Sequence, residues 1–443
     1  MTSERREDSA TRTGPWRRRA APLALLALLA AQAAGCAIFR AKDDTEHVRS
    51  SMAGIEGTVS CPTADGEPIV TVLWDADDPA KGVVRSWIAY GDEAYRFVVA
   101  APARYGLLSF RDLSSDLSWQ PGEPAAIYGE GAVVELKAGE RRTGVDVVVG
   151  TAAPKALPVE VPRAGETTVW SDSTVTYHLG ELTDLNDGRF SDENASLGLW
   201  EPSRFLKDPG IGIYFLEPYD PKKLPVLFFH GAGGSPRNFQ ALIGALDPLR
   251  FQPWLVHYAS GNRLPLICQR LAQLVLRLQA EKQVPAVGVV AHSMGGLVAR
   301  GVLNELRRAE APLEVPFLVT LSTPWGGHAA ANLGVAYSPG VVPQWVDMTP
   351  GSDFLKKLWR TPLPPEAGHY LLFGYKGQSS LFLDRANDGS VTLPSMLDLN
   401  AQAGARRVVA FDHDHMSILT APEVLATITG LINQQKPAAG EAR

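Results

Sequence analysis

The chain has 443 residues, which is too long for one ordinary hydrophobic core and predicts two domains behind a leader. Its formal net charge of −6 gives no electrostatic support to nucleic-acid binding, so we expect no nucleic-acid partner. Three cysteines are too few for a disulfide scaffold or a zinc ribbon.

Residues 1–35 have the composition of an export signal. Three arginines at 17–19 precede an apolar run over residues 20–31, which is short for a membrane span. The run ends in Ala-Ala-Gly-Cys at residues 33–36, with Ala33 where leucine is usual. This arrangement resembles the lipobox of bacterial lipoproteins, which implies lipidation of Cys36 and anchoring to an envelope membrane, the outer membrane by expectation. A plain secretory signal is the alternative, and both predict export.

Residues 36–53 are expected to be a tether, and residues 54–150 carry a β pattern. Gly, Pro and Asp clusters separate short apolar or alternating runs, at residues 69–74, 95–99, 105–110, 133–136 and 145–149. The region resembles the carboxypeptidase-regulatory-like, transthyretin-like β-sandwiches in the segments 57–59, 95–97, 105–107, 112–116 and 121–124. Asp112 and Asp116 fit acidic turns better than calcium ligands, and we expect no structural metal.

Residues 151–165 are rich in Pro and Ala and predict a semi-rigid linker. From 166 to 436 apolar strands alternate with amphipathic helices, which predicts an α/β fold with a mostly parallel sheet and helices on both faces. The expected strands lie at 211–216, 224–229, 254–256, 285–291, 318–321, 370–373 and 407–411, and the expected helices at 237–246, 264–280, 297–306 and 421–433. Residues 437–443 are expected to form a disordered tail.

A serine lies between one of these strands and the helix that follows it. The segment Ala291-His292-Ser293-Met294-Gly295-Gly296 places small residues two before and two after Ser293. A serine on a sharp strand-to-helix turn needs such neighbours, because the helix passes close to the strand. The pattern is that of a nucleophile elbow, with Ala291 in place of the usual first glycine.

A second element, His230-Gly231-Ala232-Gly233-Gly234, follows the strand at 224–229. A tetrahedral acyl intermediate carries negative charge on the former carbonyl oxygen, and backbone N–H groups must already point at it. We expect Met294, directly after the serine, and Ala232 to supply these donors. His230 is expected to be structural.

An acid and a base should follow the serine in chain order. Asp388, followed by Gly389 in a tight turn, is the expected acid; Asp384 is second and Asp398 third. The base should be His413 or His415. We favour His415, because Ile418 and Leu419 lie three and four residues after it and can anchor its loop.

Taken together, residues 225–419 resemble the serine lipase and esterase branch of the α/β-hydrolases. The segments 292–300 and 321–327 look most like triacylglycerol lipases and GPI-inositol-deacylase-like hydrolases. The resemblance implies a catalytic triad of Ser293, His415 and Asp388, an acyl-ester or lipid substrate, an acyl-enzyme intermediate, and no metal or organic cofactor.

Several alternatives stay open at this point. The same triad serves thioesterases and amidases, and a non-catalytic envelope scaffold is the competing class. Residues 323–363, with three tryptophans, fit either a lid over an acyl pocket or a packed surface excursion. Cys61 and Cys268 could pair in an oxidising compartment or remain free.

Overall fold

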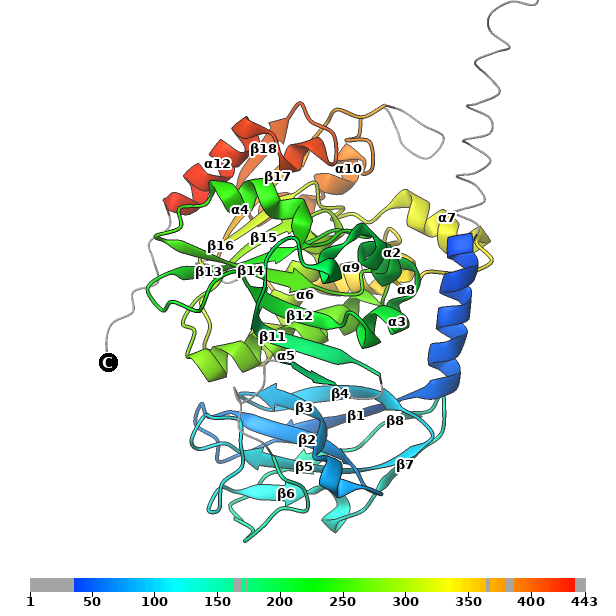
Figure 1. The fold of residues 1–443 in the computed structure, drawn as a ribbon, viewed down its shortest axis with the longest axis vertical. Coiled ribbons are helices and arrows are strands. Elements are labelled where there is room, and N and C mark those ends of the chain that lie inside the picture. The colour runs from blue at the N-terminus through cyan, green and yellow to red at the C-terminus, as the bar shows by residue number, and fades with distance from the viewer. Residues whose placement is uncertain (1–35, 162–168, 172–173, 364–366, 379–385, 435–443) are drawn as a thin grey trace, which may run out of the picture.

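The computed structural model describes residues 36–161, 169–171, 174–363, 367–378 and 386–434. The predicted signal peptide and C-terminal tail, and Asp384, lie outside these residues. A large sheet with its helices stacks on two small sheets (Figure 1).

The small sheets are formed by residues 52–148. One has the order β4-β1-β8 with β9 also on β1, and the other has the order β3-β2-β5-β6 with β7 on β5. Side chains of both, including Ile55, Leu73 and Leu107, share one core. The strands are β1 Met52–Ser60, β2 Ile69–Asp75, β3 Val83–Ala89, β4 Glu93–Ala100, β5 Ala103–Arg111, β6 Ala125–Ile127, β7 Val134–Leu136, β8 Arg141–Arg142 and β9 Val147–Val148.

The large sheet has nine strands in the order β10-β11-β12-β14-β13-β15-β16-β17-β18. From β14 to β18 every neighbouring pair is parallel, whereas β12 runs antiparallel to β14 and β10 to β11. The strands are β10 Val169–Ser171, β11 Thr176–Leu182, β12 Ile211–Phe215, β13 Leu224–Phe229, β14 Phe251–His257, β15 Gly288–His292, β16 Phe317–Leu321, β17 Gly368–Gly374 and β18 Ala405–Phe411. The predicted α/β fold class with a mostly parallel sheet is confirmed.

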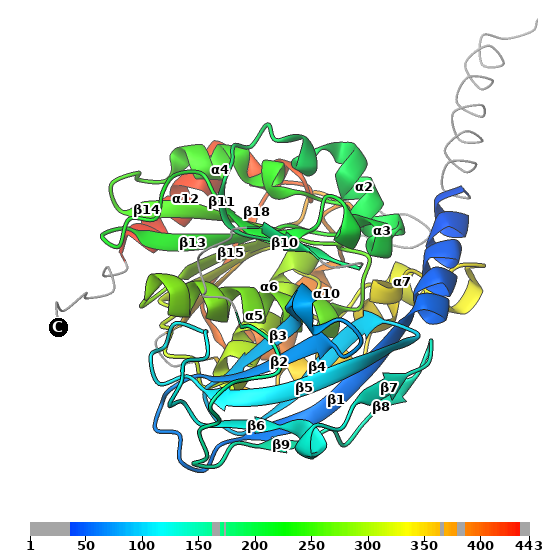
Figure 2. The ribbon, with the colours of Figure 1, turned by 60° about the horizontal axis from the view of Figure 1, so that its bottom comes forward.

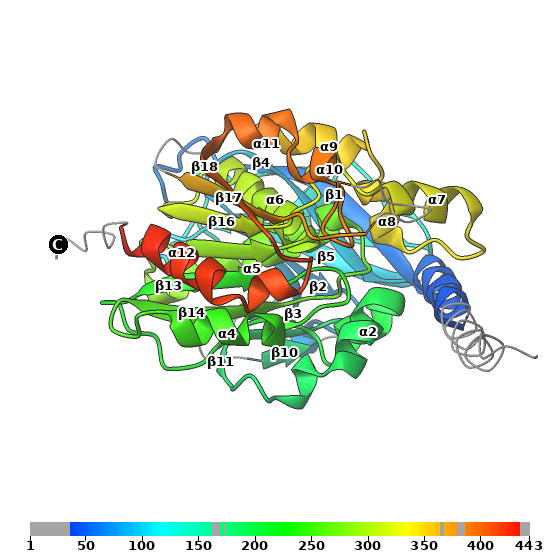
Figure 3. The same cartoon turned by 90° about the horizontal axis from the view of Figure 1, so that it is seen from above.

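Helices cover both faces of this sheet because successive strand side chains point to opposite sides. In β13, Val226 and Phe228 pack under α4 and α12, whereas Leu227 and Phe229 pack under α5 and α6. Figure 3 shows α4 and α12 side by side on their face. The helices are α2 Asp192–Trp200, α3 Pro202–Lys207, α4 Gln240–Ala245, α5 Leu264–Lys282, α6 Met294–Arg308, α7 Ala329–Tyr337, α8 Pro343–Met348, α9 Asp353–Leu358, α10 Leu393–Met396, α11 Leu399–Ala403 and α12 Pro422–Asn433.

The segment expected to be a tether is a docked helix over residues 36–51, running from the small sheets to α7 (Figure 1). Ala37 and Ala41 are buried, and the backbone of this helix lies close to Gly340, where an added Cβ would be 2.4 Å from the Ile38 oxygen. The Asp44 carboxylate accepts hydrogen bonds from the N–H and hydroxyl of Ser203 at the start of α3. In the described part of the chain, no helix is both long and apolar enough to span a bilayer.

The small sheets dock on α5 and on the far end of α6 (Figure 2). The Gln273 side chain accepts from the Ile88 N–H at 2.6 Å and donates to the Ile88 carbonyl at 3.1 Å, so it completes the edge of β3. Glu93 of β4, 5% exposed, lies 3.2 Å from Arg308 of α6. Cys61 and Cys268 are both buried free thiols.

Glu93 should make stability fall as pH rises. Burial raises its pKa from 4.5 to about 7, against the opposing effect of Arg308. The folded state therefore retains a proton that the unfolded state loses between these two values, and on the order of 3 kcal/mol of stability is lost across that window. We expect the melting temperature of Glu93→Gln to fall less between pH 5 and 8 than that of the parent. The exposed Glu135→Gln is the control, and equal pH dependence in all three proteins would contradict the assignment.

Candidate active site

Ser293 occupies the turn between β15 and α6 with φ 54° and ψ −132°. A positive φ at a non-glycine residue is strained, typically by about 1–3 kcal/mol. The turn is held by a 2.8 Å hydrogen bond from the Ser293 N–H to the Leu321 carbonyl. A Cβ on Gly295 would lie 2.2 Å from the Phe229 oxygen, and one on Gly296 would lie 2.0 Å from Thr323 Oγ1. The glycines are therefore required for α6 to start this close to the sheet.

His415 lies between the serine and Asp388. Its Nε2 is 2.9 Å from Ser293 Oγ, and its Nδ1 is 2.7 Å from Asp388 Oδ2. The His415 N–H also donates to the Asp388 carbonyl at 2.7 Å. The structure thus brings together the three residues that the sequence singled out, from the segments that follow β15, β17 and β18.

The loop that carries His415 is fixed by its apolar neighbours. Ile418 and Leu419, in a short 3-10 helix, are buried. His413 instead pairs with Glu423 of α12 at 2.6 Å. The two histidines therefore occupy different environments although one residue separates them.

Asp388 is fully buried and is held as a carboxylate. Burial alone would raise its pKa, but hydrogen bonds from His415 and from the N–H groups of Val391 and Ser390 bring it below 3.8. Gly389, with φ +97°, permits the turn. Asp398 instead caps α11 through the Asn400 N–H, and Asp384 lies outside the described residues.

The glycine-rich loop after β13 lies against the serine. A Cβ on Gly231 would lie 3.0 Å from the Ser293 Cβ, so this glycine is needed for the approach. Ala232 is exposed at the tip, and Met294 is the first residue of α6. Within the described residues neither N–H has a protein acceptor, and the N-terminus of a helix favours negative charge. These two donors are available to an oxyanion.

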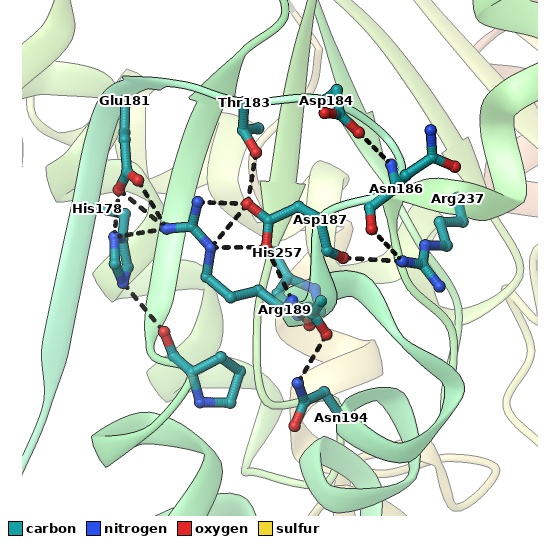
Figure 4. A network of polar contacts seen from close by, with 12 residues as sticks. His178, Glu181, Thr183, Asp184, Asn186, Asp187, Arg189, Asn194, Arg237 and His257 are labelled. Atoms are coloured by element: carbon teal, nitrogen blue, oxygen red, sulfur yellow. Dashed lines mark hydrogen bonds and ion pairs between the residues drawn. The ribbon is translucent and has the colours of Figure 1, made fainter.

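A polar network not foreseen from the sequence supports this loop (Figure 4). The Arg237 guanidinium donates to the carbonyls of residues 185, 186 and 187 at 2.8 Å, and Ser235 Oγ donates to the Phe190 carbonyl. Arg189 in turn links Asp187 to Glu181. The segment 185–190 is therefore hydrogen-bonded to the residues that directly follow the glycine-rich loop, and it fixes that end of the loop.

Two further histidines bind the loops that carry Asp388 and His415. The sequence did not indicate these contacts. His292 Nε2 donates to the His415 carbonyl at 2.8 Å, and burial lowers its pKa to about 3, so it is neutral. His328 Nε2 donates to the Ser390 carbonyl at 2.9 Å. His230 has the structural place expected of it: it is buried and stacks on Tyr258.

The segment 323–363 contains α7, α8 and α9. Trp325 is buried and contacts Trp359, and Trp345 contacts Trp200. By contrast, α7 exposes Leu333 and Tyr337. Most of the segment is packed, and a lid role stays a prediction.

The arrangement can perform nucleophilic acyl transfer. A histidine within hydrogen-bond reach of a serine can take its proton, and the carboxylate fixes the imidazole tautomer. The described residues contain no group of three His, Cys, Asp or Glu side chains placed to hold a metal ion.

Comparison with known proteins gives a partial match to one protein family and distant likenesses to solved structures. Residues 260–358, less than half of the chain, match the family model described as "Putative serine esterase (DUF676)". Bacillus licheniformis lipase BlEst2 is 20% identical over 50% of this chain and 97% of its own, with a TM-score of 0.40. A thermophilic esterase from Thermogutta terrifontis is 16% identical over 51% and 95%, with a TM-score of 0.35.

No curated protein sequence matches the chain. The family model supports an ester hydrolase, and likenesses as distant as those to the two solved enzymes add nothing about substrate.

Replacing the two histidines separately should distinguish their roles. His415→Ala removes the group beside Ser293 Oγ, so we expect phosphonylation of Ser293 by a fluorophosphonate probe to slow by orders of magnitude; loss of the histidine in a well-studied triad lowers turnover roughly 10⁶-fold. His413→Ala, two residues away, should react within a few-fold of the parent. The measurement is the labelling rate by gel fluorescence. Normal labelling of His415→Ala with collapse in His413→Ala would reverse the assignment.

Proposed function

We propose that the protein is a serine hydrolase that cleaves carboxylic esters of acyl or lipid substrates. The observation that carries this proposal is the continuous hydrogen-bond chain from Ser293 Oγ through His415 to the buried Asp388. The similarity to serine esterases over residues 260–358 supports the same reaction class.

The proposed reaction uses these three side chains and two backbone N–H groups. Ser293 Oγ attacks the ester carbonyl while His415 Nε2 takes its proton, and Asp388 stabilises the imidazolium. The N–H groups of Ala232 and Met294 bind the oxyanion. As the intermediate collapses, His415 gives the proton to the leaving alcohol. Water, deprotonated by the same imidazole, then attacks the acyl-enzyme and releases the acid.

Removal of the Ser293 hydroxyl tests the proposal. We expect Ser293→Ala to abolish hydrolysis of p-nitrophenyl esters and fluorophosphonate labelling, while leaving the melting temperature close to that of the parent, because the side chain contributes chemistry rather than packing. A series of esters of rising chain length defines the acyl preference. Turnover within a few-fold of the parent would exclude this nucleophile. Thioester or amide cleavage without ester cleavage would favour the thioesterase or amidase alternative, and no labelling of the parent would favour the scaffold alternative.

We also propose that the enzyme is exported and tethered to a bacterial envelope membrane, with the outer membrane as the expected location. The support is the arginine-rich and apolar leader ending in Ala-Gly-Cys at residues 34–36. Two or three acyl chains on Cys36 bury enough CH₂ groups, at about 0.8 kcal/mol each, for stable anchoring.

Cys36→Ser should release the protein from the membrane fraction. The substitution removes the thiol that would carry the lipid, so the parent should partition with membranes and the variant should not. Cys61→Ser is the matched control, since Cys61 is a buried thiol of the small sheets. Intact mass of the mature parent gives the direct readout. A mass without lipid, together with equal fractionation of all three proteins, would rule out the tether and leave a plain secretory signal.

A further inference from the structure

Two adjoining cavities lie where the small sheets and helix 36–51 meet the catalytic region. The smaller, about 80 Å³, lies between β3, β4 and α5. The larger, about 520 Å³, lies between β4, α3, α5 and helix 36–51. Both are lined by Val98, Leu266 and Arg270, so Arg270 stands at their junction.

The smaller cavity is cationic. Among the described residues that line it, none is acidic and four are arginines, Arg85, Arg96, Arg270 and Arg277. Arg96 pairs with Glu56 at 2.6 Å and Arg277 with Glu281 at 2.7 Å, and Arg85 donates to the Thr174 hydroxyl. Among the described residues, Arg270 has no hydrogen-bond acceptor and no acidic partner.

Arg270 is half-buried, so its guanidinium has lost part of its hydration without gaining a counter-charge from the described residues. A guanidinium withdrawn from water loses hydration, and the loss is offset only when a counter-charge or acceptors replace it. Burial lowers the pKa of Arg270, the Tyr177 hydroxyl partly opposes this, and the nearby Arg85 lowers it further. A carboxylate matches the planar fork of a guanidinium with two parallel hydrogen bonds.

The larger cavity offers an apolar volume beside that charge. Its lining includes Val48, Met52, Val98, Ala100, Leu206 and Leu266. Of its described lining residues, the acidic one, Asp44, is engaged by Ser203, and the second arginine, Arg263, pairs with Asp347 at 2.8 Å. The volume falls within the roughly 300–1,000 Å³ of small-molecule sites.

We propose that this junction binds a single-chain amphiphile with a carboxylate head, of the fatty-acid class. The carboxylate pairs with Arg270, and the chain lies between helix 36–51, α3 and α5. Binding here requires no turnover at Ser293, so it stands or falls separately from the proposed ester hydrolysis.

Titration calorimetry of the purified full chain with sodium laurate, below its micelle concentration, tests the proposal. We expect one laurate per chain at a site that Arg270→Gln weakens roughly 10- to 100-fold, the range that charge-assisted hydrogen bonds contribute. Arg270→Lys, which keeps the charge but loses the planar fork, should bind laurate more weakly than the parent and more tightly than Arg270→Gln. Val98→Phe, which fills the junction, should weaken binding as Arg270→Gln does. Arg360→Gln is the control, because Arg360 lies two residues after α9 and lines neither cavity.

Other ligands test whether the carboxylate head and the alkyl chain are both required. Binding of 1-dodecanol as tight as that of laurate, or laurate binding unchanged in Arg270→Gln, overturns the proposal. Binding of dodecyl phosphate without laurate overturns the carboxylate assignment, and binding of inorganic phosphate as tight as laurate overturns the role of the chain.

Thermal unfolding without ligand guards against a merely structural effect. Because Arg270→Gln removes an uncompensated charge, its melting temperature should equal or exceed that of the parent, and laurate should stabilise the parent more than the variant. A variant that unfolds at lower temperature than the parent without ligand would show that Arg270 has a structural partner, and the proposal would fail.

Discussion

The close approach of α6 to the large sheet is the constraint on which the site depends. A helix can begin directly under Ser293 only if three neighbouring positions carry no side chain. Gly295 faces the Phe229 carbonyl, Gly296 faces Thr323, and Gly231 faces the Ser293 Cβ. A methyl group at Gly295 or Gly296 would overlap backbone or side-chain atoms, so the helix would shift and carry the serine with it. The strained φ of Ser293 persists because the surrounding strands and helix over-determine it.

Of the two side chains next to the His415 imidazole, Asp388 is charged and His292 is neutral. Asp388 is held as a carboxylate against His415 Nδ1, where it favours the imidazolium that forms when the serine loses its proton. His292, whose ring lies 4.7 Å from that of His415, is kept neutral by burial. A cation there would oppose the imidazolium, whereas neutral His292 donates a hydrogen bond that fixes the backbone of the base. Burial thus keeps His292 neutral, so that it supports the His415 backbone without opposing the imidazolium.

Local pattern in the sequence was enough for the fold class and for the meeting of Ser293, Asp388 and His415. The strand-turn-helix around Ser293 is a short contiguous pattern, and Ile418 and Leu419 distinguish His415 from His413 through burial. The contacts of His292 and His328 could not be foreseen, because the direction of a ring depends on loops distant in sequence. Strand β3 is absent from the expected runs, and the contact that completes its edge, with Gln273, lies 185 residues away in the chain. The docking of helix 36–51 likewise depends on residues of α3.

The same helix that begins at the nucleophile ends at the small sheets. Met294 opens α6 beneath Ser293, and Arg308 closes it beside the buried Glu93 of β4. Fifteen residues at 1.5 Å each make a rod of about 22 Å between these points. Its residues 294–303 are all buried, and coupling between distant sites requires an element with two discrete arrangements. A rod buried along most of its length offers one arrangement, so α6 is no switch between its two ends but a fixed support that begins at the serine and ends at the small sheets.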